Sequence, residues 1–448
     1  MRTFFFPVAA AVLGALFLTG CGGVKTLRQA LRAAPYEKYA ASLRTADLEK
    51  TALGQDWLTA GQRALRDSLL VDLPFRETGY FAADQPGAVG YRVATRRGEK
   101  LVIMVTTQAR QPMRVFVDVF EREPDDRQPG GFKLKRVAYA DSAGRTLEYE
   151  CQRDGIHLIR LQPELLRSGQ YTVSIQNQPS LGFPVCGKGN SAVQSRFGVP
   201  REGGRRTHEG VDIFAPKRTP VVAVSKGYVT GVNENRLGGK VVWLQDEERR
   251  ITLYYAHLDS QLVRTGQRVQ PGDTVGLVGN TGNARYTPSH LHFGIYTGGG
   301  VVDPYPFIRQ ATNQPKAITA DLSRLGEWAR TAVAKSNVRL APESKAASLE
   351  ELPRYAPLRV WAGAGGWYRV TTSDGRGGYV AATSLEALEK PVRTVSLPAP
   401  TPLLDFPDFR AASLDRLAAG TSVSVLAVSG AFQYVRTPLG KLGWLARQ

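Results

Sequence analysis

Four of the five histidines in this chain of 448 residues fall in one stretch, as His208-x-x-x-Asp212, His257 and His290-x-His292. Neutral imidazoles with one carboxylate are a typical ligand set for catalytic zinc, in which three protein ligands leave one position open for water. Any fold of this chain must bring these segments together for such a site to form. The pattern predicts a metal-dependent hydrolase.

The segments that carry these histidines have the pattern of β-strands. Residues 208–214 (HEGVDIF) and 289–296 (SHLHFGIY) are rich in β-branched and aromatic residues, with apolar residues at alternate positions. In a strand, His290 and His292 point to one face, while Leu291 points to the opposite face and into a core. Two neighbouring imidazoles on one face suit metal ligation, or a ligand beside an acid or base.

His208 and Asp212 also share a strand face, but four strand steps span about 13 Å, too far for one metal ion. Gly210 between them permits the bend that would bring them together. Glu209 would face away from both residues and is not expected to act as the base. The fifth histidine, His157, lies in a separate strand-like stretch and is interpreted as structural.

Four segments in order resemble the lysostaphin-type M23 metallopeptidases, zinc endopeptidases that cut peptide bonds in peptidoglycan. The segments are THEGVDIFAPKRTPVVAVSKGYV, YYAHLDS, GQRVQPGDTVGLVGNTG and SHLHFGIY, within residues 186–312. The resemblance implies a small antiparallel β-rich domain, with one zinc ion on the floor of a groove. The stretch NARYTPSHLH departs from the usual short lead into the last two histidines and carries Arg285 and Tyr286, which puts the cross-link preference in doubt.

The resemblance also implies roles for the site residues. His208, Asp212 and His292 are the expected zinc ligands. His257 and His290 are the expected catalytic histidines beside the metal. Two neutral imidazoles and one carboxylate leave a zinc centre with a net charge of about +1, which would make a bound water acidic near neutral pH. Either catalytic histidine could accept a proton or hydrogen-bond the developing oxyanion, and the sequence does not divide these roles.

The N-terminus has the features of a bacterial lipoprotein signal. Arg2 precedes an apolar run that is too short to span a bilayer, and small residues lead to Cys21. The sequence from Leu18 to Cys21 resembles a lipobox, whose cysteine is lipidated and becomes the mature N-terminus. We therefore expect a lipid-anchored protein of the cell envelope, and Gly22 is compatible with the outer membrane, facing the periplasm. An ordinary cleaved signal with an incidental cysteine is the alternative.

The C-terminal part contains a repeat, because AASL at Ala346 and the sequence after it align with AASL at Ala411. Each copy has a short strand, aromatic residues, a glycine turn and a last aromatic residue. The repeat is similar to bacterial SH3-like modules, which accompany peptidoglycan hydrolases and bind the wall. The aromatics could instead fill two small barrel cores. They are Trp367, Tyr368 and Tyr379 in the first copy and Phe432, Tyr434 and Trp444 in the second.

The fold class predicted from these patterns is mainly β and multidomain. Apolar residues recur at helical spacing before residue 76, which predicts a stalk or a small cap. Alternating apolar runs separated by Gly, Pro and Asp follow, which predicts a β-sandwich-like domain. The expected parts are a signal peptide (1–20), a helical segment (21–75), a β-sandwich-like domain (76–185), the M23-like domain (186–318) and two SH3-like modules (319–390 and 391–448).

Cysteine and charge content bear on the compartment and the partners. Cys151 and Cys186 would lie in an oxidising compartment, where a single pair can form a disulfide, and two free thiols are the alternative. The net charge of +18 suits anionic wall polymers or lipid headgroups. Basic residues are spread out and no nucleic-acid motif is found, so nucleic acid is not an expected partner.

The expected partners are peptidoglycan peptides, the membrane through lipidated Cys21, and wall or regulatory proteins. Two alternatives to the zinc endopeptidase stay open. One is a catalytically silent regulator of wall hydrolases, and the other is a wall-binding scaffold that uses the SH3-like pair. The three retained ligand positions favour the enzyme.

Overall fold

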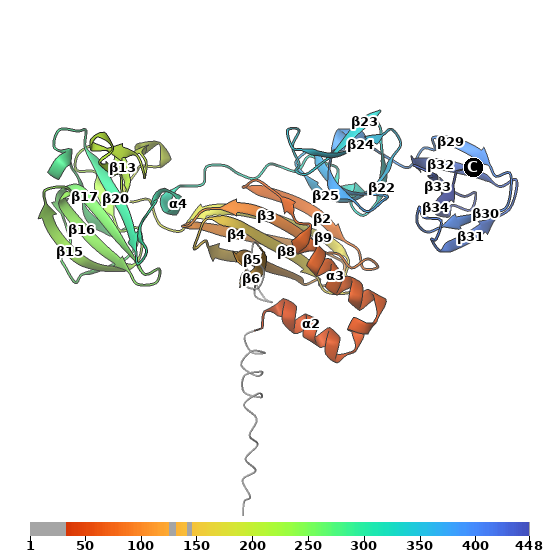
Figure 1. Cartoon of the computed structure of the whole chain (residues 1–448), viewed down its shortest axis with the longest axis horizontal. Helices are drawn as coiled ribbons and strands as arrows, with labels where there is room; N and C mark the ends of the chain where they lie inside the picture. The colour runs from red at the N-terminus through yellow and green to blue at the C-terminus, as the bar shows by residue number, and fades with distance from the viewer. Residues whose placement is uncertain (1–32, 125–130, 141–145, 448) are drawn as a thin grey trace, which may run out of the picture.

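The computed structural model describes residues 33–124, 131–140 and 146–447, and it shows a mainly β, multidomain chain (Figure 1). The fold class predicted from the sequence is therefore confirmed. The predicted signal peptide and Cys21 lie outside the described residues. Within the described ranges, no helix is both long enough and apolar enough to cross a membrane.

Two helices, α2 (Pro35–Thr45) and α3 (Ala52–Arg66), form a cap on the β-domain that follows them (Figure 1). The hydroxyl of Thr51 caps α3 by accepting the Gly54 N–H at 3.1 Å. Trp57 on the buried face of α3 stacks on Tyr36 at 5.0 Å and donates its indole N–H to the Pro163 carbonyl at 2.7 Å. These contacts hold the helical segment against the domain, so it is not a free stalk.

The β-domain consists of two sheets around a common apolar core. The first contains β1 (Leu69–Leu70), β3 (Val89–Thr95), β8 (Gly155–Pro163), β5 (Val115–Pro124) and β6 (Phe132–Tyr139) in that order. The strands of the second sheet in this domain are β2 (Phe75–Phe81), β9 (Gly169–Pro179), β4 (Glu99–Gln108) and β7 (Thr146–Glu150). His157 in β8 is buried between Thr95 Oγ1 at 2.8 Å and a Glu121 oxygen at 2.9 Å, as its structural interpretation requires.

Cys151 and Cys186 are both free thiols, so the disulfide considered from the sequence is not formed. Cys151 is packed in the apolar core of the β-domain, where its N–H donates to the Glu99 carbonyl at 2.8 Å and its carbonyl accepts the Gly98 N–H at 2.9 Å. Burial raises the pKa of its thiol to about 11. Cys186 is exposed on the next domain. The two residues are therefore held in different environments, one in a core and one at the surface.

The histidine-bearing domain (residues 181–308) is built on one antiparallel sheet, shown in green in Figure 1. Its strand order is β10 (Val193–Ser195), β13 (Val211–Phe214), β20 (His290–Thr297), β17 (Ile251–Gln261), β16 (Gly239–Asp246), β15 (Gly227–Asn235) and β18 (Arg268–Val269). Three further strands pair at the sides, β14 (Pro220–Val222), β19 (Thr274–Val278) and β21 (Gly300–Val302), and a helix, α4 (Tyr305–Ile308), follows. A separate hairpin pairs β11 (Pro200–Arg201) with β12 (Arg206–Thr207).

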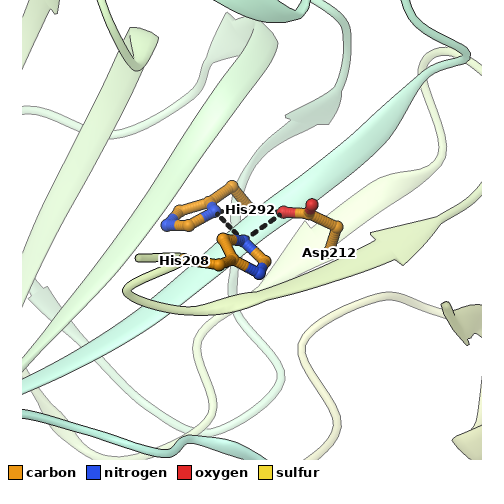
Figure 2. A group of neighbouring side chains, drawn as sticks. All are labelled: His208, Asp212 and His292. Carbon is orange, nitrogen blue, oxygen red and sulfur yellow. Dashed lines mark hydrogen bonds and ion pairs between the residues drawn. The ribbon is translucent and has the colours of Figure 1, made fainter. Parts of the chain in front are cut away.

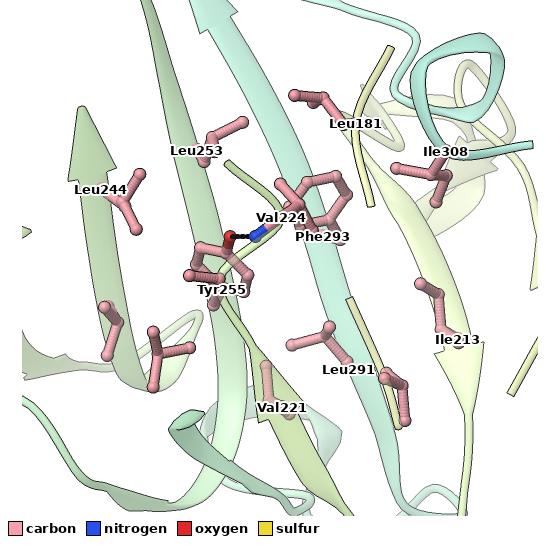
Figure 3. Packing of buried hydrophobic residues seen from close by; sticks show 14 of the residues in the cluster. Leu181, Ile213, Val221, Val224, Leu244, Leu253, Tyr255, Leu291, Phe293 and Ile308 are labelled. Atoms are coloured by element: carbon pink, nitrogen blue, oxygen red, sulfur yellow. Dashed lines mark hydrogen bonds between the residues drawn. The ribbon is translucent and has the colours of Figure 1, made fainter. Parts of the chain in front are cut away.

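Apolar side chains fill one face of this sheet (Figure 3). Leu253 and Tyr255 of β17 and Leu291 and Phe293 of β20 all point into this core. The buried Tyr255 hydroxyl accepts the Val224 N–H at 3.2 Å, which satisfies a polar group inside the core. Because successive side chains of a strand point to opposite faces, the residues next to these core residues, such as His292, lie on the other face of the sheet.

The two C-terminal modules share the pairing of six strands. The strands of the first module are β22 (Trp328–Thr331), β23 (Lys335–Arg339), β24 (Ser348–Pro353), β25 (Pro357–Ala364), β26 (Trp367–Thr372), β27 (Gly377–Ala381) and β28 (Leu385–Ala387). The second contains β29 (Arg393–Ser396), β30 (Thr401–Leu404), β31 (Ser413–Leu417), β32 (Ser422–Ser429), β33 (Phe432–Arg436) and β34 (Leu442–Ala446). In both, the first strand pairs the fourth, the second pairs the third and the sixth, and the fourth, fifth and sixth form a meander. The first module has in addition β28, which pairs with β22. The sequence repeat is thus a structural repeat.

The first module continues the second sheet of the β-domain, because β25 pairs β2 through Thr78 with Gly363 and Gly79 with Ala362. Beside this pairing, Glu77 is completely buried. Its carboxylate lies 3.2 Å from Arg369 Nε and accepts the Tyr379 hydroxyl at 2.9 Å. From the β-domain, it also accepts hydroxyl groups from Tyr91 at 2.7 Å and Tyr171 at 3.1 Å.

The second module docks on the first through aromatic side chains. The ring of Trp328 lies 5.7 Å from Tyr434 and 5.9 Å from Trp444. Arg330 of the first module donates to the Leu426 carbonyl at 2.6 Å. Most of the aromatics that define the sequence repeat are buried, but only Tyr368 lies in the core of its own module. Tyr379 lies in the core of the β-domain, against which the half-buried Trp367 packs. Phe432, Tyr434 and Trp444 lie in the cluster between the two modules, so filling two separate barrel cores does not account for these aromatics.

Candidate metal centre and active-site groove

Three donor atoms from three side chains converge in the histidine-bearing domain (Figure 2). His208 Nε2, Asp212 Oδ1 and His292 Nδ1 each lie 3.0 Å from the other two. No other group of three such donors is this close together in the parts of the chain that the structure describes. The three residues are those that the resemblance implied as zinc ligands.

The local backbone explains how residues four apart reach one point. Strand β13 begins only at Val211, so the chain bends at Gly210 before it enters the sheet. A Cβ atom on Gly210 would lie 2.6 Å from the Phe293 carbonyl and 2.7 Å from the His292 ring, so only glycine fits there. Asp212 then pairs directly with His292 across β13 and β20. The bend that the sequence required is present.

The protonation pattern of this cluster suits a cation. His208 Nδ1 lies 2.8 Å from the Arg196 carbonyl, and since a carbonyl only accepts hydrogen bonds, Nδ1 carries the proton. In a neutral ring with this tautomer, the lone pair of Nε2 points toward the Asp212 oxygen and His292 Nδ1. Acceptor atoms 3.0 Å apart repel one another unless a cation lies among them. The residues present thus fit a metal ion.

The charge state of Asp212 agrees with this arrangement. Burial opposes ionisation, but interactions with His208 and His292 outweigh it and hold the pKa of Asp212 well below its ordinary value. Arg201 from the β11–β12 hairpin donates to the other carboxylate oxygen, Oδ2, at 2.7 Å and to Ser195 Oγ at 2.6 Å. The carboxylate is therefore oriented with one oxygen on arginine and the other toward the two imidazoles.

Two further histidines flank the cluster, and a backbone carbonyl holds Nδ1 of each ring. His290 donates Nδ1–H to the Pro288 carbonyl at 2.9 Å, and its Nε2 lies 3.9 Å from Asp212 Oδ1. His257 donates Nδ1–H to the Thr281 carbonyl at 2.9 Å. Burial, followed by the neighbouring His290 and His292, lowers the pKa of His257 to about 4, so its ring is neutral at pH 7. Both rings can therefore accept a proton.

The position of His257 depends on an irregularity in β17. Tyr255 and Leu258 both point into the core, although alternation would place residues three apart on opposite faces. The pairing register with β16 shifts at this point, and His257 adopts a φ of 62°. A left-handed backbone at a non-glycine residue costs roughly 1–3 kcal/mol and is common at functional sites. The irregularity directs the imidazole into the groove.

The cluster lies in an open groove of about 460 Å³. The insertion noted in the sequence forms part of its rim, because Asn283 and Thr287 line the groove. Tyr286 is 91% exposed and does not line the groove, and the Arg285 guanidinium lies 5.9 Å from its ring. The sequence did not predict four of the residues that line the groove, because strand pairing or the β11–β12 hairpin brings them to the histidines. These residues are Arg201, Trp243, Tyr254 and Tyr296.

Comparison with known proteins gives matches to two parts of the chain. Residues 206–304 match Peptidase family M23, and residues 332–386 match the Bacterial SH3 domain. The chain is 37% identical over 139 residues to the L-Ala--D-Glu endopeptidase of Bacillus subtilis (strain 168), which covers 28% of this chain and 42% of that protein. It is 32% identical over 159 residues to the peptidoglycan DD-endopeptidase ShyC of Vibrio cholerae, and this match covers 36% of this chain and 32% of that protein.

A third relative is the uncharacterized lipoprotein YgeR of Escherichia coli (strain K12), 34% identical over 110 residues, which covers 24% of this chain and 42% of that protein. The chain thus spans less than half the length of each of these relatives. The matches cover the predicted M23-like region and the first of the two predicted SH3-like modules. This chain contains a peptidase domain of family M23 followed by a bacterial SH3 domain, and its relatives are endopeptidases of the lysostaphin type.

Proposed function

We propose that the protein is a zinc endopeptidase that hydrolyses peptide cross-links of peptidoglycan, with D,D-cross-links as the preferred bonds. The observation that carries this proposal is the convergence of three lone-pair donors beside two proton-accepting histidines in one open groove. Lipidation at Cys21 would hold the enzyme at the envelope, and the relative named a lipoprotein supports this anchor.

His208, Asp212 and His292 would hold the zinc ion, which supplies a Lewis acid for the peptide carbonyl and for water. Nε2 of His257 or His290 accepts the proton of the attacking water, because Nδ1 of each ring is held by a backbone carbonyl. The same Nε2 then donates this proton to the leaving amine. The other histidine hydrogen-bonds the oxyanion when its ring is protonated at Nε2.

Isolated sacculi test the proposal directly. The mature full chain is incubated with sacculi, once with added zinc and once with a chelator, and the released muropeptides are identified by mass spectrometry. We expect fragments with new amine termini only in the zinc sample. Release that is equal in both samples, or absent from both, would contradict the proposal, and absence would favour a non-catalytic regulator of wall hydrolases.

The two SH3-like modules differ in whether other parts of the chain cover two of their loops. In the first module, residues 341–343 and 364–367 line a pocket of about 580 Å³ that residues 72–76 and 312–316 of the same chain close. In the aligned loops of the second module, Ser429 contacts Ser373 of the first module at 2.7 Å, whereas residues 408–410 are exposed. There, Phe409 is 73% exposed and its ring lies 4.7 Å from Phe432. The second module is therefore the proposed wall-binding module.

Phe409→Ala tests this assignment. We expect the retention of the full chain on sacculi to fall by a factor of about five or more, since an aromatic at the centre of an interface commonly contributes more than about 1 kcal/mol. Leu439→Ala, at a residue that is 94% exposed in a loop of the same module, serves as the matched control. Sedimentation of the protein with chelator present measures retention without hydrolysis. Equal losses in the two variants would contradict the assignment.

A further inference from the structure

The groove has an aromatic wall beside His292 that peptide-bond hydrolysis alone does not require. Trp243, Tyr254 and Tyr296 come from the adjacent strands β16, β17 and β20, and all three line the groove. The ring centroid of Trp243 lies 4.2 Å from Tyr254 and 5.5 Å from Tyr296. The rings of Tyr254 and His292 pack edge to face, with their centroids 5.9 Å apart. The wall is thus next to the proposed metal ligands.

These rings lie on the face of the sheet opposite the main core. Leu244, Leu253 and Ile295, which are sequence neighbours of the rings, point into that core. Alternation therefore places the rings on the same face as His292. The rings pack with Val241 and Ala256 in a small apolar cluster, in which Tyr254 is buried and Trp243 and Tyr296 are half-buried. The outward face of an antiparallel sheet is usually polar, so half-buried aromatic side chains along a groove indicate a surface that receives a ligand.

Glu209 adds a negative charge to this wall. Its side chain is exposed, lines the groove, and makes no ion pair or hydrogen bond with the other described residues. Gly294 allows its backbone to come close, because a Cβ there would lie 3.2 Å from both the Glu209 carbonyl and the Tyr296 ring. Burial, and then the charge of Glu209, raise the pKa of Tyr296 to about 12. The Glu209 carboxylate and the aromatic rings therefore line the same part of the groove, where both can interact with one ligand group.

The β11–β12 hairpin brings two arginines to the groove. Arg201, which binds Asp212, and Arg206 both line it. A substrate in the groove thus meets guanidinium groups as well as aromatic rings and the Glu209 carboxylate. Charges of both signs would help to orient a peptide that carries an ammonium group and carboxylates.

We propose that Trp243, Tyr254, Tyr296 and Glu209 form a subsite for a primary ammonium group of the substrate. Aromatic faces attract cations that lie within about 6 Å of the ring centroid, and a free carboxylate adds a direct ion pair. The inference rests on the proposed function and narrows its substrate class to peptide cross-links with a free primary amine near the scissile bond. Cross-links without such an amine are poorer substrates.

The test uses the zinc-loaded mature chain and two purified cross-linked muropeptide dimers, one with free amines and one in which the same amines are acetylated. We expect acetylation to lower kcat/KM of the natural chain about tenfold, mainly through KM. Glu209→Gln and Trp243→Leu lower kcat/KM on the free dimer by a similar factor and no longer respond to acetylation. Glu234→Gln, an exposed change outside the groove, keeps the response of the natural chain.

The outcomes separate this inference from the proposed function. If the natural chain cleaves both dimers with equal kcat/KM, the ammonium subsite is wrong and the endopeptidase stands. If zinc-loaded protein cleaves neither dimer, the proposed function itself is wrong. Trp243→Leu also removes packing contacts, so Glu209→Gln, which changes an exposed side chain, is the decisive variant. If acetylation lowers kcat/KM of Glu209→Gln as much as it lowers kcat/KM of the natural chain, the proposed subsite is wrong.

Discussion

Replacing His292 by Ala abolishes both zinc binding and hydrolysis in the full chain. His292 Nδ1 is one corner of the 3.0 Å triangle with His208 and Asp212, and two remaining ligands do not make a catalytic zinc site. We expect the zinc content after dialysis to fall from about one ion per chain to near zero. Elemental analysis of the purified variant measures the metal, and release of muropeptides measures activity.

His290→Ala is the matched variant, since His290 lies on the same face of β20 and its Nε2 is 3.9 Å from Asp212. It should keep one zinc ion per chain and lose turnover by a factor of about 100 to 10,000, the usual contribution of a general acid or base. His257→Ala should behave in the same way. A His290→Ala protein that loses its zinc and still hydrolyses peptide would contradict the assignment of the ligands.

Replacing Glu77 by Ala destabilises the junction between the β-domain and the first module by about 3–5 kcal/mol. The carboxylate is completely buried, and its loss leaves the Arg369 guanidinium without its counter-ion between the two domains. The hydroxyl groups of Tyr91 and Tyr379 also lose their acceptor. Urea unfolding of the full chain, with hydrogen exchange of the β2–β25 amides, measures the effect.

Glu148→Ala is the control for this experiment. Glu148 pairs with Lys100 at 3.0 Å on the outside of the same sheet, where its side chain is 55% exposed. Such an exposed pair contributes only about 0–1 kcal/mol. If Glu77→Ala and Glu148→Ala shift the unfolding midpoint equally, the buried network does not hold the first module in place.

Strand alternation predicted much of the metal centre. It placed His290 and His292 on one face with Leu291 in the core, and the structure has this arrangement. Gly210 marked the bend that brings His208 to Asp212. These relations depend on residues close together in the sequence, so local patterns contain them.

The remaining parts of the site depend on contacts that local patterns do not contain. The shift in β17 that directs His257 into the groove arises from pairing with β16, and alternation alone would place this residue in the core. Arg201 reaches Asp212 from a separate hairpin. The buried pair of Glu77 with Arg369 joins residues 292 positions apart, and neither residue stands out among the charged residues of its own strand.

The most direct test of the central claim is the time course of free amines released from a synthetic cross-linked peptide dimer. Protein stripped of metal is compared with the same protein after one equivalent of zinc is restored. Our account predicts that cleavage is absent in the stripped sample and returns in full with zinc, with one new amine for each bond cut. Cleavage at the same rate without metal, or none after zinc is bound, would contradict it.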